Sequence, residues 1–358
     1  MKRFLVIQTA FLGDAVLATS ILEKLHDFYP DAEIDLVVRK GNEGLFGAST
    51  TGADRAYIPP PHSHPFLRNV FVWNKGQNKN RNLFALIGAL RKTEYDHIIN
   101  CQRFFSTGLM TVLSRGKEKV GYDKNPLSLL FTRSVKHEIP SGQSKESGHG
   151  VHEVDRLNAL IAHLTDGSRP LPRLYPTEMA RDEVKVIRDS WAYGHAPYIC
   201  IAPASVWSTK QWPEGKWVGL VKAVSETHHV YLIGSPGDVP LCERIMRSAQ
   251  RGQVVAKDLS LLGSAALMQG AAMNYVNDSA PLHIASAMNA PVTVVFCSTV
   301  PSFGFGPLRE NGRVVETTEK LDCRPCGLHG HRECPQGHFR CALGIEVRQL
   351  TEAGFPPQ

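Results

Sequence analysis

The sequence predicts an α/β protein of two domains, each built on a sheet of mainly parallel strands. Its 358 residues exceed the usual length of a single domain. Short apolar runs alternate with segments of helical periodicity along the chain, and this alternation is typical of parallel sheets covered by helices. The proline-rich stretch Asp166–Pro176 separates two such series, so we expect it to link a first domain at residues 1–170 to a second at residues 177–358.

In the first half, the apolar run Phe4–Ile7 predicts a buried strand. Apolar residues at helical spacing between Leu17 and Phe28 predict the helix that follows, which Pro30 ends. Further strands are expected at Ile34–Val38, Ala56–Ile58, Tyr95–Asn100 and Lys119–Tyr122, and further helices at Leu83–Lys92, Thr107–Ser114 and Glu153–Leu164.

The second half repeats the alternation of strands and helices after the proline-rich stretch. Its strands are expected at Tyr198–Ala202, Val230–Ile233, Val254–Ala256, Met273–Val276, Val292–Phe296 and Arg313–Glu316. Its helices are expected at Glu178–Trp191, Gly215–Thr227, Leu241–Ala249, Leu261–Gln269 and Leu282–Met288.

The composition indicates a folded globular protein and argues against a nucleic-acid-binding protein. Hydrophobic residues make up 42% and charged residues 21% of the chain, which fits a folded globular protein. The net charge of +6 favours an anionic partner but is too small to indicate nucleic acid, for which the sequence carries no motif. Gln8 and Asp14 interrupt the apolar run at the N-terminus, so we expect the first strand of a cytoplasmic protein there and not a signal peptide.

Residues able to carry chemistry follow the predicted strands in both halves. Gly13 and Asp14 follow the first strand, and parallel sheets bind ligands at the carboxyl ends of their strands. The candidates in the second half are Ser205, Thr209 and Lys210 after one strand, Asp278, Ser279, Ala280 and His283 after another, and Gly234 and Ser235 in a looser strand-to-helix turn.

Three of these segments, Phe11–Ala15, Thr209–Pro213 and Asn277–Ala285, occur in the order found in glycosyltransferase family 9, the ADP-heptose:lipopolysaccharide heptosyltransferases. The sequence resembles this family from its first strand to its C-terminal cysteines. The resemblance implies a GT-B architecture, in which two Rossmann-like doubly wound domains face a cleft. It also implies an acceptor site on the N-terminal domain, an ADP-sugar site on the C-terminal domain, and an inverting transfer of heptose without a metal ion.

The resemblance gives Asp14 the role of the base that takes the proton from the acceptor hydroxyl, with Gly13 beside the acceptor. Glycine allows a backbone to approach a ligand closely. The alternative is that Asp14 caps the first helix, because aspartate is a favoured N-cap residue. The start of a helix also lowers the pKa of a carboxyl group, which makes it a weaker base unless the site is desolvated.

Lys210 has the charge needed to stabilise the ADP leaving group, since an enzyme without a divalent ion must supply fixed positive charge there. Ser205 and Thr209 can add hydroxyl donors. The alternative is an exposed lysine beside a packed tryptophan, because lysine side chains mostly face solvent.

The run Asn277–His283 predicts an anion site at a helix N-terminus, with Asp278 or Ser279 as the cap. The resemblance implies that Asp278 binds the sugar and that Ser279 and Ala280 bind the pyrophosphate. Ala280 stands where many members have glycine, and Pro281 removes one N–H donor. His283 either binds the sugar donor or is a structural histidine. Gly234 and Ser235 resemble the nucleotide-side loop of the family, and a plain turn explains them equally well.

Four cysteines near the C-terminus predict a structural zinc or iron site, although no cofactor is expected to be needed for catalysis. Cys323, Cys326, Cys334 and Cys341 lie within 19 residues, and such clusters in a cytoplasmic protein favour metal over disulfides. The alternative is a loop of reduced, packed thiols. Some relatives that heptosylate proteins hold iron with four cysteines. The remaining four cysteines are expected to be buried thiols.

The expected partners are an ADP-sugar donor and an anionic lipopolysaccharide-core acceptor, with peripheral contact to the inner face of the inner membrane. A tract rich in lysine and arginine between Arg115 and Lys136 is the candidate surface for an anionic acceptor or membrane. The alternatives are a heptosyltransferase that acts on a protein and a non-catalytic ADP-sugar-binding protein. A nucleotide oxidoreductase is disfavoured because the first turn lacks the glycine pattern of dinucleotide sites.

Overall fold

The structure is a computed structural model that describes residues 1–47, 57–58, 63–76, 78–139, 151–191, 196–308 and 312–352. It divides into two compact units. The first contains Met1–Ile139 and Glu153–Tyr175, and the second contains Pro176–Gln358 with the short stretch that ends at His152. No helix among these described ranges is long and apolar enough to cross a membrane.

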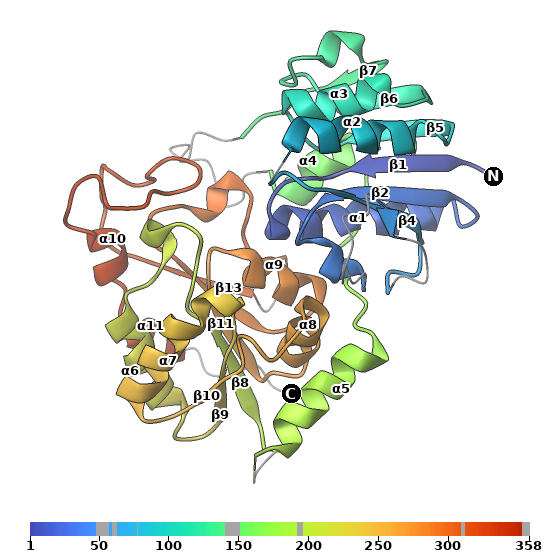
Figure 1. The fold of residues 1–358 in the computed structure, drawn as a ribbon. Coiled ribbons are helices and arrows are strands. Elements are labelled where there is room, and N and C mark those ends of the chain that lie inside the picture. The colour runs from blue at the N-terminus through green and yellow to red at the C-terminus, as the bar shows by residue number, and fades with distance from the viewer. Residues whose placement is uncertain are drawn as a thin grey trace. The chain divides into compact units, whose positions relative to one another are not determined.

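The first unit is built on a sheet whose strand order is β3-β4-β2-β1-β5-β6-β7 (Figure 1). All neighbouring strands in the described residues are parallel except the edge pair of β3 and β4. The strands are β1 (Arg3–Ile7), β2 (Glu33–Arg39), β3 (Tyr57–Ile58), β4 (Leu67–Trp73), β5 (Tyr95–Asn100), β6 (Gly116–Tyr122) and β7 (Arg133–Val135).

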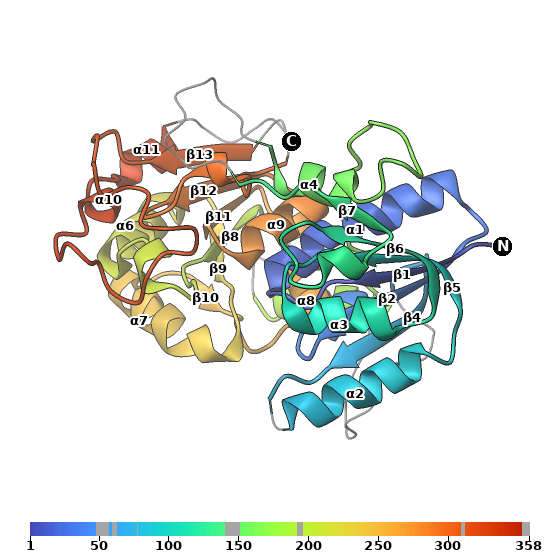
Figure 2. The same ribbon diagram turned by 90° about the horizontal axis from the view of Figure 1, so that it is seen from above.

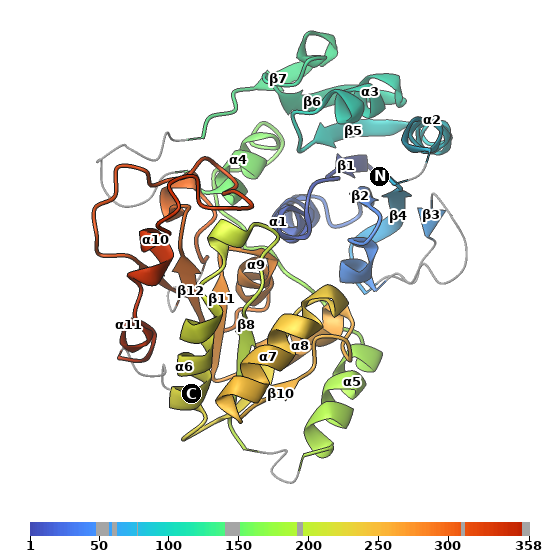
Figure 3. The same cartoon turned by 60° about the vertical axis from the view of Figure 1, so that its left-hand side comes forward.

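Helices cover both faces of this sheet. α1 (Leu12–Phe28) packs with α4 (Glu153–Ala159), and α2 (Lys79–Leu90) packs with α3 (Phe105–Leu113) on the opposite face (Figure 3). The sequence did not predict β4 or β7. Of the strand expected at Ala56–Ile58, the last two residues form β3, and Ala56 lies outside the described residues.

The second unit is a sheet of parallel strands in the order β10-β9-β8-β11-β12-β13. Its strands are β8 (Tyr198–Ala202), β9 (His229–Leu232), β10 (Gln253–Val254), β11 (Met273–Asn277), β12 (Val292–Phe296) and β13 (Gly312–Glu316). Its helices are α5 (Glu178–Asp189), α6 (Glu214–Val224), α7 (Val239–Ala249), α8 (Leu261–Gln269), α9 (Ala280–Ala287), α10 (Arg340–Leu343) and α11 (Val347–Thr351).

Both faces of this second sheet are also covered. α6, α7 and α11 lie on one face, and α5, α8 and α9 lie on the other (Figures 1 and 3). Trp212 and Trp217 pack edge to face in the core beside α6, with ring centroids 5.0 Å apart. The two doubly wound sheets confirm the predicted α/β fold class.

The expected linker is largely packed against the first unit. The buried Nζ of Lys24 in α1 donates to the backbone oxygen of Asp166 at 2.8 Å and pairs with its carboxylate at 2.9 Å. Farther on, the hydroxyl of Tyr175 donates to the Glu23 carboxylate at 2.9 Å. The compact part of the first unit therefore extends to Tyr175, because side chains of α1 hold the proline-rich stretch.

Candidate functional site

Gly13 and Asp14 lie in the first turn of α1, after the carboxyl end of β1. The residue at the N-cap is Phe11, whose backbone is extended and whose side chain makes no capping bond. The alternative that Asp14 is the N-cap residue is therefore wrong, since Asp14 lies three residues inside. Asp14 is half-buried and belongs to the first turn of the helix, where the helix dipole favours negative charge.

A group of cations lies on the same carboxyl edge of the first sheet. Lys75, which follows β4, donates from Nζ to the Thr9 oxygen after β1 at 2.5 Å. Burial, together with the nearby charges of Arg39 and Lys79, lowers the pKa of Lys75 to about 8. Sequence reasoning missed these residues because β4 was not predicted. The run Val70–Trp73 was the available signal.

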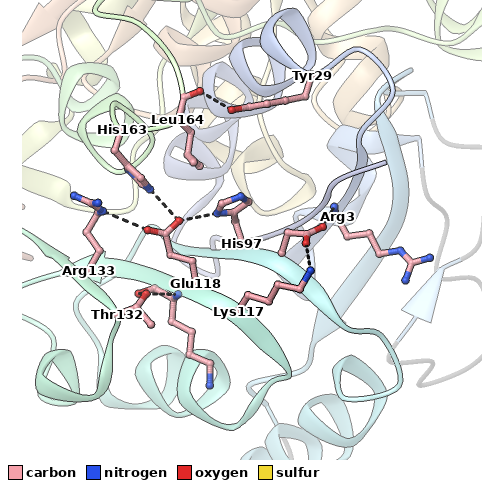
Figure 4. Close-up of polar contacts among 11 residues, drawn as sticks. Arg3, Tyr29, His97, Lys117, Glu118, Thr132, Arg133, His163 and Leu164 are labelled. Carbon is pink, nitrogen blue, oxygen red and sulfur yellow. Dashed lines mark hydrogen bonds and ion pairs between the residues drawn. The ribbon is translucent and has the colours of Figure 1, made fainter.

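Half of the six basic residues in the expected tract, namely Lys117, Arg133 and Lys136, form ion pairs within the protein. Lys117 pairs with Asp96 at 2.7 Å, and Arg133 lies 3.4 Å from Glu118 (Figure 4). The other oxygen of Glu118 contacts His97 at 2.7 Å, and burial lowers the pKa of this histidine. These contacts join neighbouring strands, so the tract is in part a structural feature.

At the carboxyl edge of the second sheet, the structure brings Lys210 and Asp278 together. Lys210 Nζ lies 2.6 Å from Asp278 Oδ2, and the Thr299 hydroxyl donates to the same oxygen at 2.6 Å. The Lys210 side chain is only 14% exposed and that of Asp278 6%. Lys210 is therefore not the exposed lysine of the alternative interpretation. Sequence reasoning missed Thr299, which follows β12.

The loop that carries Lys210 is fixed to the end of β11 by the buried side chain of Asn277. Its Oδ1 accepts from the Trp212 backbone N–H at 3.0 Å, and its Nδ2 donates to the Pro203 oxygen at 2.8 Å. Within the loop, the Gln211 side chain donates to the Ser205 backbone oxygen at 2.7 Å. Ser205 thus stays on the same edge as Lys210. These bonds use its backbone oxygen and not its hydroxyl.

Thr209 is buried and is held by the C-terminal segment. Its hydroxyl accepts from the His331 N–H at 2.7 Å, and its own N–H donates to the His331 oxygen at 3.1 Å. The Ser298 hydroxyl lies 3.1 Å from the same Thr209 oxygen. Gly330 has φ +75°, and a Cβ there would lie 2.8 Å from the Thr209 hydroxyl oxygen, so only glycine fits. The Thr209 hydroxyl is thus engaged within the protein.

The start of α9 has no side-chain cap. Ser279 occupies the N-cap position, but its side chain accepts no capping bond, and Asp278 is engaged with Lys210. The expected capping by either residue is therefore absent. Ala280 begins the helix, Pro281 has no N–H, and the Leu282 N–H donates to the Ser279 oxygen at 3.0 Å. In the described residues, the Ala280 N–H is therefore the backbone donor that this helix start can offer to an anion.

His283 lies one turn into α9 and is 6% exposed. Burial lowers its pKa to about 3, with the Asp278 charge opposing this shift, so the ring is neutral near pH 7. Among the described residues, its Nδ1 has no hydrogen-bond partner. The ring therefore has one nitrogen available to a ligand, close to the Lys210 and Asp278 charges.

Gly234 and Ser235 follow β9 on the same edge but are used by their own turn. The backbone N–H and the hydroxyl of Ser235 both donate to the Asp238 carboxylate at 2.7 Å. A Cβ at Gly234 would lie 2.9 Å from the Cβ of Asp238. These contacts are typical of a tight strand-to-helix turn. Because the Ser235 side chain is used within the turn, only the backbone of this segment could face a nucleotide.

The four C-terminal cysteines are free thiols in one segment after β13. Cys326 Sγ donates to the Cys323 oxygen at 3.1 Å, and Cys323 Sγ lies 3.7 Å from His338 Nε2. Burial, together with the neighbouring Cys326 and Cys334, raises the pKa of Cys341 to about 11. In the described residues, no three histidine, cysteine or acidic side chains are arranged to hold a metal ion. The other four cysteines are buried thiols, as predicted.

Arg324 anchors this segment to the end of β12. Its guanidinium donates to the Cys297 oxygen at 2.7 Å and the Thr299 oxygen at 2.8 Å, and it pairs with Glu316 at 2.8 Å. The segment, drawn in red in Figures 1 and 2, runs from β13 to α10. It therefore supports Thr299 as well as Thr209, and through them the Lys210–Asp278 pair. Sequence reasoning missed Arg324, although it stands between the first two cysteines.

Two doubly wound α/β units, one of them with a buried lysine and a helix start at the carboxyl edge of its sheet, are typical of the GT-B class of glycosyltransferases. The chain belongs to glycosyltransferase family 9 (heptosyltransferase), whose sequence model matches residues 83–335. This match includes Lys210 and Asp278 and three of the four C-terminal cysteines.

Known proteins similar to this chain support the assignment. Lipopolysaccharide heptosyltransferase 1 of Pseudomonas aeruginosa is 23% identical over 342 residues, which cover 90% of this chain and 86% of that protein. The structure of E. coli ADP-heptose lps heptosyltransferase II matches with a TM-score of 0.74 at 19% identity, over 98% of this chain and 97% of that one. The structure of E. coli heptosyltransferase WaaC with ADP matches with a TM-score of 0.68 at 20% identity, over 98% of both chains.

Proposed function

We propose that this protein transfers heptose from ADP-L-glycero-D-manno-heptose to an inner-core sugar of lipopolysaccharide. The observation that carries the donor half of this proposal is the Lys210–Asp278 pair beside the uncapped start of α9. A cation beside a helix start at the carboxyl edge of a parallel sheet is suited to a pyrophosphate. The names of the similar heptosyltransferases support the sugar and the acceptor.

In the proposed reaction, the acceptor hydroxyl oxygen attacks the anomeric carbon of heptose from the side opposite ADP, which inverts that centre. Asp14 takes the proton from the attacking hydroxyl, and the bond between the anomeric carbon and the ADP oxygen breaks. Lys210 and the Ala280 N–H at the start of α9 stabilise the charge that develops on ADP, so the step requires no metal ion. Asp278 and His283 orient the sugar, and Ser205 adds a hydroxyl donor.

The proposed acceptor is anionic. Arg39, Lys75 and Lys79 lie on the carboxyl edge that carries Gly13 and Asp14. Their charges add to burial in lowering the pKa of Lys75, and a bound anion would relieve the repulsion between them. Such an acceptor is attached to lipid, so we place the enzyme in the cytoplasm, at the inner face of the inner membrane.

Donor choice is the test of this function. We expect the melting temperature to rise selectively with ADP-heptose over ADP-glucose and UDP-glucose, because a ligand that binds the folded state stabilises it by about 2.7 kcal/mol at 100 times its Kd. Mass spectrometry should then detect one heptose added to a heptose-free lipopolysaccharide core. A larger shift with a UDP-sugar, or transfer of a hexose from it, would assign another donor.

We also propose that Cys323, Cys326, Cys334 and Cys341 hold one structural zinc or iron ion. Cys323 and Cys334 lie close enough to Cys326 and Cys341 to raise the pKa of the latter two thiols. The four form a suitable donor set, although in the described residues they are not arranged around a common centre. Elemental analysis of protein purified without added metal is expected to find about one ion per chain. Four reactive thiols without metal would instead support the reduced loop.

A further inference from the structure

The loop between β6 and β7 presents two leucines to solvent. Leu129 is 98% exposed and Leu130 is 59% exposed. Both lie in a short 3-10 helix, η2 (Ser128–Leu130), at the β7 edge of the first sheet. Large apolar side chains in this position are unusual, because adjacent exposed apolar groups on a protein surface typically mark an interaction site.

This exposure does not arise from a loose loop. The Asn125 side-chain oxygen accepts from the Leu127 N–H at 3.0 Å, and the Ser134 hydroxyl donates to the Ser128 oxygen at 3.0 Å. The Phe131 ring packs so closely on Gly121 that a Cβ there would lie 2.5 Å from it. Backbone bonds and an aromatic anchor therefore hold the two leucines outward.

A second exposed pair lies beside this loop. Phe104 and Phe105, at the start of α3, are 60% and 55% exposed. The Asn125 side chain joins the two segments, because its Nδ2 donates to the Phe104 oxygen at 3.0 Å. The two leucines and the two phenylalanines, here called the apolar patch, thus follow the carboxyl ends of the neighbouring strands β5 and β6.

Positive charge flanks the apolar patch on both segments. Arg103 precedes the two phenylalanines, Lys124 precedes the leucine loop, and both are exposed. In the described part of the chain, neither makes an ion pair, whereas Arg133 and Lys136 nearby are paired with Glu118 and Glu138. The nearest exposed carboxylate on this loop, that of Asp123, accepts a hydrogen bond from the His137 N–H.

We propose that the apolar patch, with Arg103 and Lys124, docks the N-terminal unit onto an anionic lipid surface. Apolar side chains enter the boundary between headgroups and acyl chains, while lysine and arginine beside them attract anionic headgroups. The proposal rests on the proposed function only in that a lipid-linked acceptor explains why the enzyme would dock. Docking itself can be measured without donor or acceptor.

The test is sedimentation of the full chain with vesicles of phosphatidylcholine, either pure or containing phosphatidylglycerol. We expect binding to the anionic vesicles and weak binding to the neutral ones. The double variant Leu129→Ser/Leu130→Ser should bind at least about tenfold more weakly, since one leucine side chain leaving apolar surroundings accounts for about that factor. Lys124→Ser should weaken binding about fivefold at low salt.

The matched control is Met179→Ser/Val186→Ser on α5, where the two side chains are 72% and 69% exposed. It removes similar apolar surface from the second unit and should leave vesicle binding unchanged. Unchanged binding by the leucine variant, or an equal loss in the control, would overturn the proposal. A leucine variant with wild-type vesicle binding but a smaller mass by sedimentation velocity would show that a second copy covers the patch. Failure of ADP-heptose transfer alone leaves the docking result intact.

Discussion

Replacing Asp14 with asparagine is expected to lower the rate of heptose transfer by about 10²–10⁴, the usual contribution of a general base. Asparagine has the same shape but does not accept the acceptor proton. Phe11, not Asp14, is at the N-cap of α1. The substitution keeps the shape of the side chain and removes a negative charge from the first helical turn, worth about 0.3–1 kcal/mol. The melting temperature and the affinity for ADP should therefore stay close to wild type.

The measurement is single-turnover transfer with saturating donor, alongside the melting temperature. Asp27→Asn is the matched control, since it removes an exposed carboxylate from the last turn of the same helix. Its transfer rate should equal that of wild type. If Asp14→Asn transfers heptose normally with an unchanged melt, Asp14 has no part in the mechanism. A lowered melt with a proportionate loss of activity would make its role structural.

The fold and the positions of the candidate residues could be predicted because both depend on local patterns. Buried strands such as Tyr198–Ala202 and Met273–Asn277 appear as apolar runs, and a polar segment directly after each run marks its carboxyl end. Since β8 and β11 are adjacent and parallel, Lys210 and Asp278 meet at one edge. Lys210 and Asp278 could be selected from the sequence without knowing the order of the strands. That they contact each other follows only from the strand order.

The residues that support the site could not be predicted, because their contacts join segments far apart in the sequence. Thr299 reaches Asp278 only because β12 lies beside β11. The His331 N–H donates to Thr209, which lies 122 residues earlier in the sequence. The sequence around neither residue indicates this partner. The extent of the first unit was missed for the same reason, because Lys24 lies 142 residues from the segment that it holds.

Replacing Lys210 with alanine is expected to lower turnover by about 10²–10³, the usual loss when a charged or polar contact to a developing anion is removed. The substitution also leaves the buried Asp278 carboxylate with Thr299 as its remaining partner, so the melting temperature should fall as well. Lys216→Ala is the matched control. It breaks an ion pair with Glu346 in the same unit, at 2.7 Å, and should leave turnover unchanged.

The double variant Lys210→Ala/Asp278→Asn separates the two effects of Lys210. It leaves no unpaired buried charge, so its melting temperature should recover toward that of wild type. If Lys210 stabilises the departing ADP, the double variant still turns over slowly although its stability has recovered. Its turnover is then about 10² lower than that of Asp278→Asn alone. If Lys210 serves only to hold Asp278, the double variant and Asp278→Asn have the same turnover. Equal rates for these two variants would therefore remove Lys210 from the chemistry.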